Sequence, residues 1–236
     1  MKPELVEKIK SRGYWRINFE PLVAEQKLRL GECRDIVEKN SVGLRGWNYP
    51  HYPRRIADDS GLEPGANYYE GWIDWWSHLE FWRMYESGQF LHYVALVEDW
   101  QEKDGWTGSR EERIEPKTVI GITGSIVYEL TEIYEFLSRL ATAGVYDEGV
   151  RTTVSLNNTK GRKLWIEKPG RRFYTDYKTQ LETIEYTKKY SKEDLTTKPK
   201  ELAFEAIIYI CDRFGWHQPS VDVIKKDQAN LLTRQI

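Results

Sequence analysis

The chain has few of the residues on which common metal and redox sites depend. Its 236 residues include only two cysteines, two methionines and four histidines. Cys33 and Cys211 both lie in apolar segments, which predicts small buried side chains in a reducing compartment rather than a disulfide. The histidines lack H-E-x-x-H spacing, and two distant cysteines do not make a zinc site. The sequence therefore predicts neither a metal centre nor a cofactor.

The sequence also lacks the signatures of membrane spans, leader peptides and several common enzyme families. No apolar run approaches the roughly 18 residues that a membrane span requires, and residues 1–13 are charged, without the apolar core of a leader peptide. We therefore expect a cytoplasmic protein that has no membrane partner. There is no G-x-x-x-x-G-K-[ST] phosphate loop, no G-x-G-x-x-G after a strand and no G-x-S-x-G elbow. Nucleotide hydrolysis and serine-hydrolase chemistry thus lose their usual signatures.

Charge is unevenly distributed, although the net charge is only -2. Residues 98–115 contain seven acidic residues against three bases, whereas residues 157–200 contain twelve Lys and Arg against six acids. If the second segment forms one face, it will attract nucleic acid or an acidic protein partner. The alternative, which we favour, is an ordinary solvated surface.

Aromatic residues are abundant, with ten Trp, fifteen Tyr and seven Phe. Five of the tryptophans lie in residues 67–100. Alternation over residues 90–97 predicts a strand buried on both faces, paired through a Ser87-Gly88 turn with a strand over residues 81–85. The first half of this aromatic segment instead repeats at intervals of three and four, which indicates a helix: Trp72, Trp75, Trp76, Leu79 and Trp82.

Strand and helix patterns also alternate through the first 140 residues. Residues 14–19 and 42–47 are typical of strands, and residues 28–40 of an amphipathic helix. A long loop is expected up to residue 66. Apolar residues from Val119 to Leu140 recur at spacings of 3-4-4-3-4-3, which predicts a long helix lying across the sheet.

The last third of the chain completes the predicted fold class. Short strand-like pieces at 152–156, 163–166 and 172–177 indicate a meander, and residues 202–214 and 221–232 indicate two helices. Together the patterns predict an α+β fold, with a mainly antiparallel twisted sheet packed against a long central helix and C-terminal helices. We expect one domain over residues 1–236, with a subdivision near residues 145–150 as the alternative.

A cluster of arginine and aromatic residues is the main candidate site. Arg45 beside Trp47, followed by His51 and Arg54, provides a guanidinium fork for a phosphate or carboxylate and a ring for stacking. The alternative, favoured slightly, is that Arg45 is a core residue that pairs with a buried acid while Trp47 packs. The catalytic residues, if any, are unknown. The full candidate binding set comprises Arg45, Trp47, His51, Arg54, Trp72, His78 and Arg83.

Other polar residues are more typical of structural roles. His92 lies on a predicted buried strand face, so a hydrogen-bonded core imidazole is expected. Glu132 and Glu135 are close enough on a helix to share a cation, but Glu135 also precedes Arg139 by four residues, the spacing of an ordinary helix ion pair. Asp176 and Lys178 match the acid-x-Lys pattern of metal-dependent nucleases, a pattern that arises easily by chance.

The chain contains several short motifs: Arg12-Gly13-Tyr14-Trp15, Leu44–Trp47 with Pro50, Trp82–Phe90 and Leu130–Phe136. Together they resemble an uncharacterised bacterial family whose members accompany Schlafen-type, AlbA-like putative DNA-binding domains. The similarity covers roughly the first 140 residues, and the AlbA-like domain itself is not evident. The resemblance implies an accessory or sensing module in bacterial antiviral defence, and it assigns no catalytic residues.

These observations predict a non-catalytic recognition module. Its partner would be a protein, a nucleic acid bound through residues 157–200, or an anionic ligand bound at the arginine and tryptophan cluster. The alternative hypothesis is a metal-dependent hydrolase or nuclease that uses Asp176, Lys178 and an unidentified acid.

Overall fold

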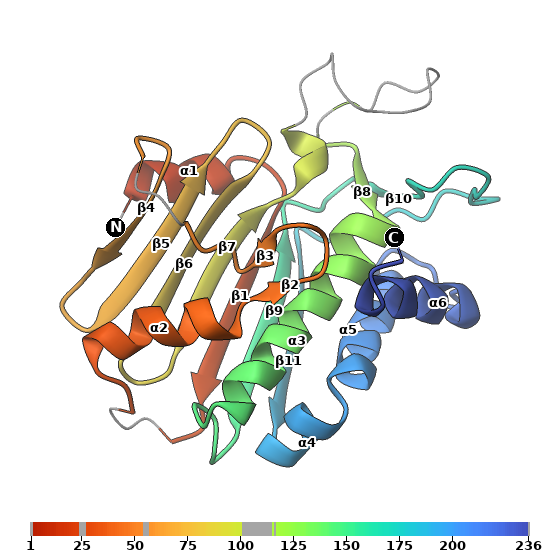
Figure 1. The fold of residues 1–236 in the computed structure, drawn as a ribbon. Helices are drawn as coiled ribbons and strands as arrows, with labels where there is room; N and C mark the ends of the chain where they lie inside the picture. The colour runs from red at the N-terminus through yellow and green to blue at the C-terminus, as the bar shows by residue number, and fades with distance from the viewer. Residues whose placement is uncertain (1, 24–26, 54–56, 101–114, 116, 236) are drawn as a thin grey trace.

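The computed structural model describes residues 2–23, 27–53, 57–100, 115 and 117–235 (Figure 1). Its centre is a seven-stranded sheet in the order β11-β9-β1-β7-β6-β5-β4, in which every neighbouring pair is antiparallel. Strands from both sides of residues 145–150 belong to this sheet. Its strands are β1 (Tyr14–Pro21), β4 (Ser60–Pro64), β5 (Tyr68–Asp74), β6 (Leu79–Tyr85), β7 (Phe90–Ala95), β9 (Val150–Asn157) and β11 (Thr183–Tyr190).

Helices cover the two faces of the sheet unequally (Figure 1). Helix α1 (Pro3–Lys10) packs on β6 and β7 at one face, while α2 (Leu30–Asn40) and α3 (Glu129–Thr142) lie on the other. Helices α4 (Lys192–Thr197) and α5 (Pro199–Arg213) pack against α3. Helix α6 (Val221–Leu232) packs against Ile122–Tyr128, the turns that precede α3. This is the α+β arrangement that the sequence predicts. No described helix is long and apolar enough to cross a bilayer.

The long helix begins later than predicted. Val119–Gly121 forms the short strand β8, which pairs in parallel with β10 (Lys163–Trp165). The chain then forms seven residues of π-helix, Ile122–Tyr128, before the fourteen residues of α3, which together make a 21-residue helix. The apolar stripe is as expected, because Ile126, Leu130, Ile133, Leu137 and Leu140 are fully buried. The central helix is therefore confirmed, and its first turns are wider than those of an α-helix.

The aromatic segment forms strands joined by turns, so the helix predicted over Trp72 to Trp82 is wrong. Trp72 and Trp82 lie on β5 and β6, and Trp75 and His78 close the turn between them with reciprocal backbone hydrogen bonds of 3.1 and 3.3 Å. Two hairpin strands and a short turn thus mimic helical spacing by coincidence. The turn at Ser87-Gly88 is confirmed, and Gly88 has a φ of +84°.

Strand β7 is fully buried on one face only. Phe90, His92 and Val94 are buried beneath α3, whereas the alternate residues are partly exposed. Helix α1 covers Tyr93 and Ala95 in a second, smaller apolar cluster with Ile9. The prediction of two buried faces is therefore only half right, because α1 is too short to cover the whole sheet.

Other short segments also differ from the predictions. Residues 44–47 bend, and only β2 (Val42–Gly43) and β3 (Asn48–Tyr49) on either side of them are strands. Residues 60–64, expected to be loop, form β4, and residues 172–177 form no strand. The predicted meander does not form. Instead, β9 pairs with β11, a strand in which buried Ile184 and Tyr186 alternate with exposed polar residues.

Candidate ligand-binding site

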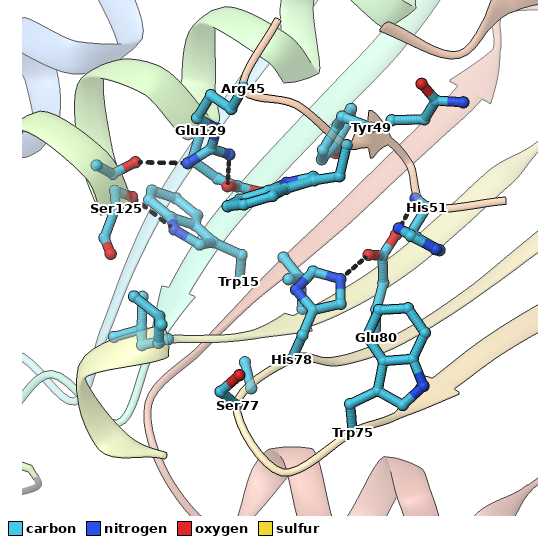
Figure 2. A pocket seen from close by; sticks show the side chains of 17 residues that line it. Trp15, Arg45, Tyr49, His51, Trp75, Ser77, His78, Glu80, Ser125 and Glu129 are labelled. Carbon is cyan, nitrogen blue, oxygen red and sulfur yellow. Dashed lines mark hydrogen bonds and ion pairs between the residues drawn. The ribbon is translucent and has the colours of Figure 1, made fainter. Parts of the chain in front are cut away.

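A pocket of about 350 Å³ opens at one end of the sheet (Figure 2). Its walls come from the β2–β3 connection, the β5–β6 turn, the end of β7 and the π-helical turns that precede α3. Pockets of this size suit a small molecule or a single side chain. The lining residues are Trp15, Arg45, Trp47, Asn48, Tyr49, His51, Trp75, Ser77, His78, Glu80, Val94, Ala95, Leu96, Val97, Gly124, Ser125 and Glu129.

Arg45 and Glu129 line one side of the pocket, and Glu132 lies behind Arg45. The Arg45 guanidinium binds the carboxylates of both Glu129 and Glu132, with Nη2 2.7 Å from Glu129 Oε2 and Nε 2.9 Å from Glu132 Oε2. Burial alone would lower the pKa of Arg45, but these two carboxylates raise it overall. Burial also raises the pKa of Glu132 to about 7, against the lowering effect of Arg45 and with a further contribution from Glu129.

His78 and Glu80 form the opposite side (Figure 2). His78 Nε2 lies 2.7 Å from Glu80 Oε2, and His92 Nε2 lies 2.9 Å from Glu80 Oε1. Burial would raise the pKa of Glu80, but the charges and hydrogen bonds of the two histidines hold it well below its usual range. Burial would likewise lower the pKa of His78, but the hydrogen bond and charge of Glu80 raise it overall.

Exposed aromatic residues surround the mouth. Trp47 and Trp75 are 48% and 39% exposed, and the neighbouring Trp76 is 64% exposed. The ring centroids of Trp47 and Trp75 lie 6.4 and 6.3 Å from that of His78, and the Arg45 guanidinium lies 5.5 Å from the Trp47 ring centre. Large rings are usually mostly buried, so exposed indoles gathered at one opening are a feature typical of binding surfaces.

Strand β6 holds the irregular segment that contributes His51. Glu80 Oε1 accepts a hydrogen bond from the His51 backbone N–H at 2.7 Å, and Trp82 Nε1 donates to the His51 carbonyl at 2.9 Å. Trp82 in turn packs flat against Gly71 on β5, where a Cβ would meet the indole at 2.4 Å. The segment therefore depends on two regular strands for its position.

The structure brings four of the predicted site residues together and places Trp72 and Arg83 away from them. Arg45, Trp47, His51 and His78 all line the pocket. Trp72 is buried under α1 with Leu5, Val6 and Ile9, and is not a lining residue. Arg83 also lies away from the lining, since it points to the other face of β6 and pairs with Glu70 at 2.7 Å. Arg54 lies outside the described residues.

The structural interpretations of Arg45 and His92 agree with the contacts. Arg45 pairs with buried acids as its alternative interpretation states, yet it also borders an open pocket. His92 is fully buried between Tyr49 Oη at 3.0 Å and Glu80. Glu132 belongs to the Arg45 cluster, and Arg139 donates a hydrogen bond to the Ser41 carbonyl.

The candidate set omits most of the lining residues, among them Trp15, Trp75, Glu80 and Glu129. Trp75 was interpreted as part of a helix face, and Glu129 lies within the Val119 to Leu140 pattern, in which only apolar positions were counted. Glu80 carried a usable signal, because a carboxylate in the middle of an apolar strand must be paired when buried.

The features that favoured a nuclease or nucleic-acid site are dispersed. Asp176 and Lys178 are exposed in a segment without strand structure, and Asp176 pairs with Lys163 at 3.4 Å. Among the described residues, no three His, Cys, Asp or Glu side chains are placed to hold a metal ion. Several bases of residues 157–200 also form ion pairs with carboxylates: Arg162, Lys163, Lys168, Arg171, Lys192 and Lys198. Most of the acidic segment 98–115 lies outside the described residues.

Comparison of the chain with protein-family models, curated proteins and solved structures found no match.

Proposed function

We propose that the protein is a recognition module that binds a small ligand in the pocket beneath Trp47 and Trp75. The observation that carries this proposal is the pocket itself, whose opening is surrounded by exposed indole rings and whose interior presents a few fixed polar groups. Ligand sites typically combine a mostly apolar wall with a few placed polar groups. Trp and Arg are also the residues that contribute most to binding energy at recognition surfaces.

The polar groups of the pocket are already oriented before a ligand binds. Glu80 is fixed by His78, His92 and the His51 backbone, and Arg45 is fixed by two carboxylates. Side chains fixed in this way lose little conformational entropy when a ligand binds. This supports a binding role that depends on a preformed site.

Ligand-dependent stabilisation tests this function. We expect members of a metabolite library to raise the midpoint of thermal unfolding and to change the intrinsic tryptophan fluorescence. The Trp47→Ala and Trp75→Ala variants should lose both effects while keeping their own unfolding midpoints within a few degrees of the parent. Tyr174→Ala is the matched control, because Tyr174 is 95% exposed and is not a lining residue. If no library member stabilises the parent protein, the proposal is wrong.

A substitution at Trp76 distinguishes a small ligand from a protein partner. Trp76 follows the lining residue Trp75 in the chain and is 64% exposed, but it does not line the pocket. A Trp76→Ala variant should therefore keep small-ligand binding. A protein partner docked across the mouth would be lost in that variant as well as in Trp47→Ala.

An enzyme is the second candidate function, favoured by one observation. His78 is held by the carboxylate of Glu80, an arrangement that orients an imidazole for acid–base catalysis. Turnover of ester or phosphoester substrates that is lost in His78→Gln, with ligand binding retained, would establish this candidate. A role in bacterial antiviral defence rests on the sequence resemblance alone.

A further inference from the structure

Carboxylates outnumber permanent cations around the pocket. Glu80 and Glu129 line it and Glu132 lies behind Arg45, and all three are at most 8% exposed. Among the described lining residues, Arg45 is the one permanent cation. It leaves one buried oxygen of each α3 acid, Glu129 Oε1 and Glu132 Oε1, without a hydrogen-bond partner. Burial is the main cause of the raised pKa of Glu132, and the neighbouring charge of Glu129 raises it further against the lowering effect of Arg45.

The aromatic walls are suited to the same sign of ligand charge. The face of an indole carries negative potential and attracts cations that lie within about 6 Å of the ring centre. The pocket already uses this property, since the Arg45 guanidinium lies 5.5 Å from the centre of the Trp47 ring. Trp75 presents a second, partly exposed indole, whose ring centroid is 5.2 Å from that of His51.

An anion would meet an unfavourable environment here. The guanidinium that could attract it is already neutralised by Glu129 and Glu132, and Glu80 adds a further carboxylate on the opposite side. An uncharged ring would stack on the tryptophans but would leave the excess negative charge uncompensated. A ligand with a positive charge satisfies both the carboxylates and the ring faces.

We infer that the ligand of this pocket is a small organic cation, such as a free ammonium compound, held against Trp47 and Trp75 and near Glu80 and Glu129. This inference rests on the recognition function proposed above and specifies its ligand class. The volume of about 350 Å³ admits a molecule of the size of choline or a larger amine.

Choline and its uncharged isostere 3,3-dimethyl-1-butanol test the charge directly. The two molecules have the same shape and differ by one positive charge. We expect choline to bind at least about ten-fold more tightly at pH 8, measured by titration calorimetry or tryptophan fluorescence. Trp47→Ala and Trp75→Ala should each weaken choline binding, whereas Tyr174→Ala should leave it unchanged. Equal binding of the two molecules would overturn the inference.

The pH dependence of choline binding provides an independent test. The charged groups that face His78 are Glu80, Glu129 and Arg45, and those that face Glu132 are Arg45, Glu129 and Glu80. Glu132, whose pKa burial raises to about 7, gains a proton between pH 8 and pH 6, so the pocket becomes less negative. Choline affinity should therefore fall on acidification, and Glu132→Gln should reduce this fall. A choline affinity that rises on acidification would overturn the inference.

The outcomes separate this inference from the function on which it rests. If neither probe binds while other library compounds stabilise the protein in a Trp47-dependent manner, the pocket binds ligands but the cation class is wrong. If no compound binds, both proposals fail. Co-sedimentation with phosphatidylcholine vesicles without binding of free choline would place the cation in a lipid headgroup and overturn the free-ligand form.

Discussion

Arg162, which is buried, and Arg45, which is partly buried, are paired with acids in different ways. Arg162 is 1% exposed and binds both oxygens of Asp99, at 2.9 and 2.6 Å, and the Asp99 carboxylate also accepts hydrogen bonds from the Gly13 and Lys117 backbone N–H groups. Arg45 is shared between two acids, borders a pocket and leaves two carboxylate oxygens without a partner. The fully hydrogen-bonded pair is typical of a structural role, whereas the unbalanced cluster beside the pocket is the one that the proposed function assigns to a ligand.

The largest expected effect is the loss of the Arg162 partner. Arg162→Met leaves Asp99 buried without its cation, and we expect the free energy of unfolding to fall by about 3–5 kcal/mol. Arg45→Met should cost less, about 1–2 kcal/mol, because one α3 acid can take up a proton instead. Urea denaturation at pH 7 measures both values.

Arg151→Met is the control for these variants, since its pair with Glu20 spans 3.5 Å and both side chains are largely exposed. It should change stability by less than about 1 kcal/mol. If Arg162→Met and Arg45→Met lower the free energy of unfolding equally, the proposed distinction between the two clusters is wrong.

The two clusters should also respond to pH with opposite signs. Burial would raise the pKa of Asp99, but Arg162 and the backbone N–H groups lower it overall, so its contribution to stability is lost as pH falls through the folded-state value. Burial raises the pKa of Glu132 from 4.5 to about 7. The folded state therefore holds a proton that the unfolded chain has released, and stability is lost as pH rises from about 4.5 to 7.

For Glu132 this loss amounts to at most about 3 kcal/mol, at about 1.4 kcal/mol for each pH unit. As pH rises from 4.5 to 8, the free energy of unfolding of the parent should therefore fall by this amount relative to that of Glu132→Gln. Denaturation curves of both proteins across this pH range measure the difference. Glu167→Gln is a useful comparison, because burial also raises the pKa of Glu167 to about 7. The Thr123 and Gly124 backbone N–H groups, at the start of the π-helix, donate hydrogen bonds to its carboxylate and oppose this rise. Parallel curves for the parent and Glu132→Gln would contradict the assigned titration.

The smallest expected effect on stability is that of substituting an exposed tryptophan at the pocket opening. Trp47 is about half exposed, so Trp47→Ala should change the free energy of unfolding by less than about 1 kcal/mol. Trp82→Ala provides the contrast, because this fully buried ring should cost about 3–5 kcal/mol. A rim substitution that costs as much as Trp82→Ala would show that Trp47 supports the fold rather than a ligand.

The sequence was most informative where one periodicity dominated. The apolar stripe from Ile126 to Leu140 and the alternation in Phe90 to Val94 both predicted the right elements, because burial on one face imposes a regular spacing. Trp72 to Trp82 failed because two strands and a tight turn reproduced helical intervals. Strand β11 was missed although its alternation is visible, since its lysines favoured an interpretation as solvated surface.

The candidate site was only partly predictable for a different reason. Arg45 and Trp47 were identified from local chemistry, but their partners Glu129 and Glu132 are more than 80 residues away in sequence. Nothing in the local pattern of α3 marks those two acids as neighbours of Arg45. Long-range pairing of this kind follows from the fold, so the excess of carboxylates became visible only in three dimensions.

The contact between Gly71 and Trp82 links the sheet interior to the pocket. Trp82 can lie flat only because position 71 has no side chain, and the same indole holds the His51 carbonyl at 2.9 Å. An alanine at position 71 would push the indole away and release the loop that carries His51. Under the function proposed above, ligand selectivity would thus depend on a residue that has no functional group and is not among the lining residues. A survey of natural variants for altered selectivity should include that position.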